Sequence, residues 1–178
     1  MDDKKKLRVW SIIGVFVVFL LAAGWHFVYS DVLKSGITAA IAPVNESPWE
    51  HAKLFFLPAI IWYVILYFIA GRKFENFIFS HAIALPIMPV IMLLLFYGYQ
   101  LILPESLAID ILISFVVVAL GQLIAYALTV SKKKLSGARW NAAAMIIVLV
   151  MLAVFIYFTY SPPKIDMFFD RSEMKYGI

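Results

Sequence analysis

The sequence predicts an all-α protein, a polytopic integral membrane helical bundle of about five transmembrane helices. Five apolar runs are each long enough to cross a bilayer, which takes about 20 mostly apolar residues per helix. The chain of 178 residues is 64% hydrophobic, with a mean hydropathy of +0.93, and the basic residues between the runs fall on alternate sides. With connections this short we expect a single transmembrane domain over residues 1–178 and no soluble domain.

The charges of the connections predict how the chain is oriented. Ten of the fifteen basic residues and three of the eleven acidic residues fall on the side of the N-terminus, whereas the other side carries five basic and eight acidic residues. The positive-inside rule then places the N-terminus inside and the C-terminus outside. This asymmetry accounts for the basic pI, so nucleic-acid binding is not needed to explain it, and we expect no nucleic acid as a partner. The expected partners are the lipid bilayer and a membrane protein. The predicted spans cover residues 9–30, 48–70, 76–102, 106–130 and 139–160.

The first span has an alternative interpretation as a secretory signal peptide, because basic residues precede it and small residues occur at 22–24. Its apolar run continues through residues 27–29, beyond the length of about 7 to 15 residues that is typical of a signal peptide. A retained helix is therefore favoured. The chain contains no cysteine, which excludes disulfides and thiolate ligands.

The second and third spans contain the strongest local indications of helix ends and bends. Ser47 is placed to cap the second span, Glu50 to close a capping box with it, and Pro58 to kink the helix. Pro86 and Pro89 make the third span the best candidate for a broken helix that faces the bundle interior. An ordinary proline kink is the simpler alternative.

The densest polar cluster is the run Asn-Glu-Ser-Pro-Trp-Glu-His at residues 45–51, at the outer mouth of the second span. His26 lies about one turn below the outer end of the first span, so His26 and His51 could meet. With a nearby carboxylate they would supply the nitrogen and oxygen ligands that zinc accepts. We take His26, His51 and Glu50 as candidate metal ligands, with Glu46 and Asp31 as alternative carboxylates.

Simpler roles compete with this metal hypothesis, because the sequence has no ligand spacing such as H-x-x-x-H. Glu50 could serve only as a cap, and either histidine could only hydrogen-bond a neighbouring helix. His81 lies near the opposite end of the third span, most of the bilayer away. The candidate catalytic groups are Glu46, Glu50 and His51.

The segment 161–178 is too apolar and aromatic for a freely solvated tail. We expect it to pack onto the outer face, either as a lid over a cavity with Asp166 or Asp170 turned inward, or as an interfacial anchor. The candidate ligand-binding residues are therefore His26, Asn45, Glu46, Trp49, Glu50, His51, Asp166 and Asp170.

The run at residues 45–51, together with the Pro-Pro, Phe-Phe-Asp and final Tyr-Gly-Ile of the tail, resembles a family of small bacterial multi-span membrane proteins known only as a domain of unknown function. The resemblance implies that the two outer segments form one feature and that the protein lies in a bacterial plasma (inner) membrane. It implies no activity, substrate or cofactor. The chain departs from the resemblance at residues 171–174, where a turn-forming stretch is expected.

Three functions fit these observations. The favoured one is binding of a small polar or cationic ligand at the outer face, as a transporter or transporter component, because the outer mouth is acidic and aromatic. One alternative is a membrane-embedded hydrolase, metal-dependent or not, that acts on a lipid or lipid-linked substrate. The other is an assembly or immunity factor that works through helix contacts and has no small-molecule site. No motif names the ligand or a cofactor.

Overall fold

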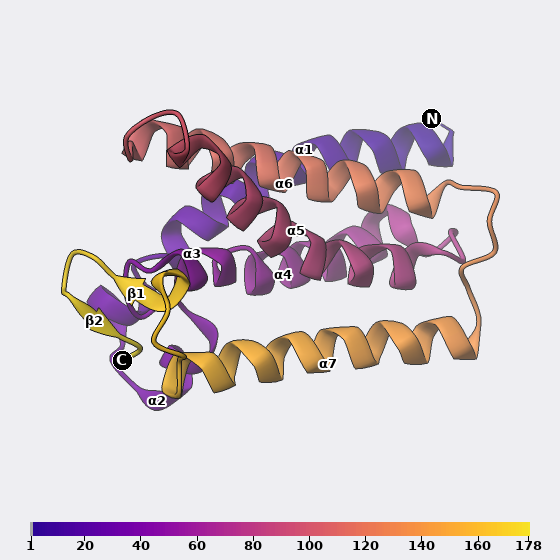
Figure 1. Ribbon diagram of the computed structural model, residues 1–178. Coiled ribbons are helices and arrows are strands. Elements are labelled where there is room, and N and C mark those ends of the chain that lie inside the picture. The colour runs from indigo at the N-terminus through magenta and orange to yellow at the C-terminus, as the bar shows by residue number, and fades with distance from the viewer. Residues whose placement is uncertain (1) are drawn as a thin grey trace.

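The computed structural model describes residues 2–178, which are mostly helical with one small β-hairpin (Figure 1). Five helical segments are long and apolar enough to cross a membrane, which confirms the all-helical fold class and fits a multi-pass membrane protein. The first is a single helix, the second is divided, and the last three are again single helices. They are α1 (Asp3–Trp25), the segment Pro48–Gly71, α5 (Phe77–Gln100), α6 (Leu107–Thr129) and α7 (Ala138–Tyr160).

The bundle has two chemically different ends, with the N-terminal and C-terminal residues at opposite ones (Figure 1). We call one the lysine-rich end; it comprises residues 2–8, 72–76 and 130–139. We call the other the hairpin end; it comprises residues 26–47, 101–106 and 161–178. The hairpin is formed by β1 (Phe169–Asp170) and β2 (Lys175–Tyr176), which pair antiparallel.

The first span lies closer to the N-terminus than residues 9–30 predicted, because α1 begins at Asp3 and ends at Trp25. Asp3 in the first turn suits the positive end of the helix dipole. After α1 the chain forms a short π-helical turn, η1 (Val28–Val32), and then α2 (Gly36–Ile41). Ser35 begins α2 with a capping box shared with Thr38.

The second span is divided into α3 (Pro48–Lys53), α4 (Phe56–Leu66) and a π-helical turn, η2 (Tyr67–Gly71). Ser47 caps α3 by accepting a hydrogen bond from the Glu50 amide at 3.4 Å. The predicted capping box is wrong, because the Glu50 carboxylate accepts from the Val44 amide instead. The break between α3 and α4 follows from Pro58, which has no amide hydrogen to donate to the carbonyl four residues earlier.

The third span is not a broken helix, since α5 is continuous from Phe77 to Gln100 although it contains Pro86 and Pro89. It packs closely on α6, where Gly121 lies directly against the Met88 side chain. A Cβ atom on Gly121 would lie 2.5 Å from the Met88 sulfur. Such close contact across small residues is typical of helices in membranes, and it supports α5 along its length.

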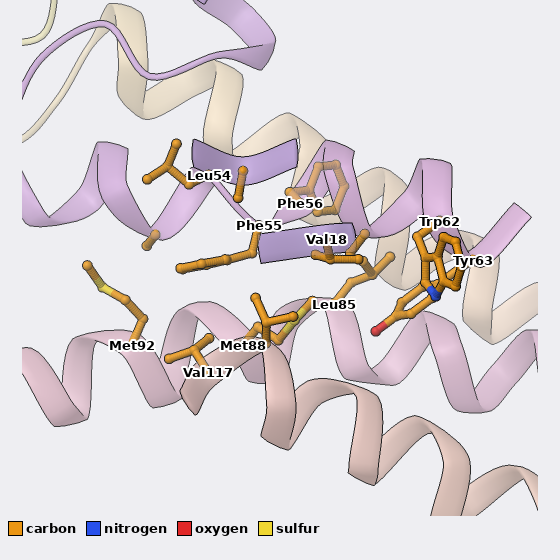
Figure 2. Packing of buried hydrophobic residues seen from close by; sticks show 14 of the residues in the cluster. Val18, Leu54, Phe55, Phe56, Trp62, Tyr63, Leu85, Met88, Met92 and Val117 are labelled. Carbon is orange, nitrogen blue, oxygen red and sulfur yellow. The ribbon is translucent and has the colours of Figure 1, made fainter. Parts of the chain in front are cut away.

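The buried core lies between α1, α4, α5 and α6, as the packed side chains in Figure 2 show. Phe55 and Met88 are almost fully buried there. The outward faces of the same helices carry exposed apolar side chains, among them Phe16, Val64 and Leu94. Exposed apolar faces around an apolar core are what a helix bundle surrounded by lipid requires.

Candidate metal centre at the hairpin end

Three side chains from separate parts of the chain converge at the hairpin end: His26, Glu46 and His51. The Nε2 atoms of the two histidines lie 3.2 Å apart. Glu46 Oε2 lies 3.4 Å from Nε2 of His26 and 3.2 Å from Nε2 of His51. We call these three residues the His-Glu-His cluster.

The two histidines reach the cluster from the ends of two helices. His26 is the C-cap residue of α1, and its neighbour Trp25 donates from Nε1 to the Ile41 carbonyl at 2.9 Å, which ties the end of α1 to the end of α2. His51 belongs to the first turns of α3. The imidazole rings stack with centroids 5.3 Å apart. The ends of α1 and α3 thus bring the two rings together.

Glu46 comes from the loop before α3, and this loop is held by the C-terminal hairpin. The Glu46 amide donates to Asp170 Oδ2 at 3.0 Å. Asn45 donates from Nδ2 to the Gly177 carbonyl at 2.8 Å and accepts from the Ser47 amide at 2.9 Å. The motif at 45–51 and the tail are thus one structural unit, which is what the resemblance implied.

Asp170 is fully buried and acts as the fixed point of this unit. Its Oδ1 accepts from the Ser172 amide at 2.7 Å and from the Glu173 amide at 3.0 Å, which forms the turn of the hairpin. Burial alone would raise the pKa of Asp170, but the hydrogen bonds from Ser172, the Glu46 amide and Glu173 together lower it. The carboxylate is therefore charged at neutral pH and holds both segments.

The distances within the His-Glu-His cluster match one face of a tetrahedral metal site. Zinc bonds of about 2.0 to 2.2 Å place neighbouring ligand atoms about 3.3 to 3.6 Å apart in a tetrahedral site, close to the 3.2, 3.2 and 3.4 Å found here. Hydrogen bonding fits less well. If both imidazoles donate to Glu46, their two N–H groups face each other. Hydrogen bonds therefore account for at most two of the three short distances. A single metal ion bonded to all three atoms would account for all of them.

The electrostatics of the cluster favour a cation. The hydrogen bond to Glu46 raises the pKa of His26. The hydrogen bonds from His26 and His51 hold the pKa of the Glu46 carboxyl far below its usual range. The Glu46 side chain is 50% exposed, and those of the two histidines are about a quarter exposed. Glu46 is thus an ionised, half-exposed carboxylate that attracts a cation, and a proton on His26 competes with a metal ion for the site.

Glu50, the expected third metal ligand, lies apart from the His-Glu-His cluster. It is buried together with Lys53, and Glu50 Oε2 lies 2.7 Å from Lys53 Nζ. Lys53 also donates to Thr159 Oγ1 at 2.8 Å and to the Ala39 carbonyl at 2.9 Å. Thr159 lies 2.9 Å from Glu50 Oε1. This buried network joins α3 to α7 and to the end of α2.

The remaining candidate residues have structural contacts away from the cluster. Trp49 packs in an aromatic group with Phe155, Phe158 and Phe168. Asp166 is exposed and pairs with Arg171 at 3.0 Å. Phe168 of the tail thus packs on Trp49 of α3, which fits the anchoring role considered for the tail.

Sequence reasoning missed Lys53 and Thr159, the partners of Glu50. In the sequence, Lys53 contributes only as one of the five basic residues of the outer side. The available indication was the spacing of Glu50 and Lys53, three residues apart on one helix face at the start of an apolar span. Ionisable residues at such a position are expected to be paired.

Comparison with known proteins identifies the family of the chain. A family model described as "Family of unknown function (DUF6512)" matches residues 1–178. Searches of the curated proteins and of the solved structures found no match. Because the model covers the whole sequence, the chain belongs to this family of unknown function.

Proposed function

We propose that the protein is a multi-pass membrane protein that binds a divalent transition metal ion, best fitted by zinc, at its hairpin end. His26, Glu46 and His51 are the ligands. The observation that carries the proposal is the near-equal triangle of their three ligand atoms, with edges of 3.2 to 3.4 Å. Two imidazoles and a carboxylate form a donor set that zinc accepts, and three protein ligands leave a fourth position open.

The charge distribution supports an orientation with the lysine-rich end in the cytoplasm, since basic residues favour the cytoplasmic side. The His-Glu-His cluster would then face the outside. The resemblance to small bacterial multi-span proteins supports a bacterial plasma membrane as the location. The protein would meet its metal ion on the outer side of that membrane.

Capture of the ion, as a transporter component, is the function that we favour for this site. The bound metal would be the cationic ligand at the outer face. Leu54 and Phe55, which follow α3 directly, belong to the buried apolar core. An ion path needs polar groups along its length, so we propose that a membrane-protein partner supplies the path and that this chain supplies the binding site.

Hydrolysis of a lipid or lipid-linked substrate is the second candidate, favoured by the open fourth position. A water bound there would have a pKa of about 7. The candidate catalytic groups limit this function, because Glu46 and His51 are used as ligands and Glu50 is paired with Lys53. A general base would have to come from elsewhere.

The proposal is tested by zinc analysis of detergent-purified protein that has been stripped with chelator and reloaded. We expect one zinc per chain in the wild type. His26→Ala/His51→Ala and Glu46→Gln should each lose it, with affinity falling by more than about 100-fold. Glu105→Gln, an exposed carboxylate at the same end, is the matched control and should bind like the wild type. A wild type that retains no zinc would refute the proposal.

The same protein distinguishes the two functions. A zinc-loaded hydrolase should cleave a soluble aryl ester faster than the zinc-free Glu46→Gln variant does. A capture protein should bind and release zinc without that activity, and by itself should move no zinc into vesicles. Equal ester cleavage by both forms would exclude hydrolysis at this site.

A further inference from the structure

A groove of about 370 Å³ lies at the lysine-rich end, far from the metal site. Its walls come from three parts of the chain: the first turn of α1, the connection before α5, and the connection after α6. Five lysines line it, Lys4, Lys73, Lys132, Lys133 and Lys134, with one acidic residue, Glu75, whose carboxylate accepts from the Ser136 hydroxyl. Cationic side chains that are distant in sequence therefore share one concave surface.

Asn76 fixes the shape of this groove. Its Nδ2 donates to the Lys133 carbonyl at 2.8 Å and to the Ser131 carbonyl at 3.4 Å, and its Oδ1 accepts from the Leu135 amide at 2.9 Å. Asn76 is itself buried. The segment with three consecutive lysines is thus tied to the start of α5 through its main chain, which leaves the lysine side chains free.

The groove has unpaired donors. Lys73 is paired with Asp3 at 2.9 Å. Lys4, Lys132, Lys133 and Lys134 have no ion-pair partner among residues 2–178. The hydroxyl oxygen of Ser131, which also lines the groove, is buried without a hydrogen-bond partner in the part of the chain that the structure describes.

We propose that this groove binds a phosphate group, carried either by the headgroup of an anionic lipid or by a free phosphate ion. Ammonium groups and a hydroxyl are donors, and phosphate offers several charged acceptor oxygens to them at once. The groove lies where apolar helices end, which is the level of lipid headgroups in a membrane. A lone carboxylate would leave most of these donors unused. The inference is independent of the metal site.

The test uses the full chain in neutral detergent, and its variants remove charge without touching Asn76. In Lys132→Gln/Lys133→Gln/Lys134→Gln the groove loses three charges. The matched control, Lys34→Gln/Lys164→Gln/Lys175→Gln, loses three charges at the hairpin end instead. Circular dichroism verifies the fold, and Lys133→Gln alone replaces the triple variant if that variant is misfolded.

Native mass spectrometry measures retention of phosphatidylglycerol against phosphatidylcholine, and equilibrium dialysis measures binding of inorganic phosphate. We expect the groove variant to bind at least about tenfold more weakly than the wild type, and the control variant to bind as tightly as the wild type. High salt should weaken binding to the wild type in the same way, because it screens the lysine charges. Loss confined to phosphatidylglycerol identifies a lipid headgroup as the source, and loss of inorganic phosphate identifies the free ion. No preference for either ligand in the wild type, or an equal loss in the control, would overturn the proposal.

Discussion

The buried pair of Glu50 and Lys53 should be required for stability, and its energy can be worked out from the contacts. Lys53 Nζ has three donors, and all three are used, by Glu50, Thr159 and the Ala39 carbonyl. Lys53→Met leaves the Glu50 carboxylate with only the Val44 amide and the Thr159 hydroxyl. Glu50→Gln leaves the ammonium without its opposite charge. Breaking a buried pair from one side costs about 3 to 5 kcal/mol, because the other charge stays buried.

The double variant Glu50→Gln/Lys53→Met should lose less than the sum of the two single variants. Neither new side chain is charged, both have similar volumes to the originals, and glutamine keeps an acceptor for Val44 or Thr159. We expect a coupling energy of about 2 to 3 kcal/mol. The exposed pair of Asp3 and Lys73 is the control, and its loss should cost under about 1 kcal/mol.

The free energy of unfolding, measured by tryptophan fluorescence in mixed micelles, gives all the values in one assay. If Glu50 served only as a helix cap, Glu50→Gln would be nearly silent, because glutamine also closes a capping box. Silent single variants, or single effects that add in the double variant, would refute the assignment of a buried ion pair.

Three further predictions concern the metal site and the packing. Zinc affinity should fall as the pH drops from roughly 8 to roughly 6, because the raised pKa of His26 lets a proton compete with the metal. Calorimetric titration measures the affinity at each pH. A constant affinity over this range would contradict the prediction. Asp170→Asn should weaken zinc binding by roughly tenfold at unchanged helix content, because it weakens the hydrogen bond that holds the loop carrying Glu46. An unchanged affinity in the same titration would show that this loop keeps its conformation without Asp170. Gly14→Ala should destabilise by about 1 to 3 kcal/mol, since its Cβ would lie 2.1 Å from Trp62 Nε1, whereas Gly24→Ala, with open space around it, should be neutral or stabilising in the same unfolding assay.

The apolar spans could be predicted from the sequence because each one depends only on local composition. The meeting of His26 and His51 could also be predicted, since both lie near the same ends of neighbouring spans. The choice between Glu46 and Glu50 could be predicted only in part: the spacing of Glu50 and Lys53 indicates a pair, but the position of Glu46 could not be predicted. It depends on the loop conformation, which Asp170 sets from 124 residues away. Such a contact leaves no periodic pattern in the sequence.

The prolines show the same limit. Pro58 was expected to kink the second span, which divides near it, between α3 and α4, whereas Pro86 and Pro89, which made the third span the candidate for a broken helix, lie within the continuous α5. A proline removes one hydrogen bond wherever it occurs. Whether the helix then divides depends on its neighbours. α5 is held along its length by α6 and α7, whereas α3 is fixed separately by the buried network of Glu50 and Lys53.

The link between Asn45 and Gly177 spans 132 residues, and it sets an order of events during biosynthesis. His26, Glu46 and His51 emerge from the ribosome early, but the hairpin that holds their loop is made only after all five apolar segments. The metal site would therefore mature last, after the helices have been inserted. Nascent chains arrested before residue 170 should enter membranes without acquiring zinc, so metal content would report completed assembly of this protein.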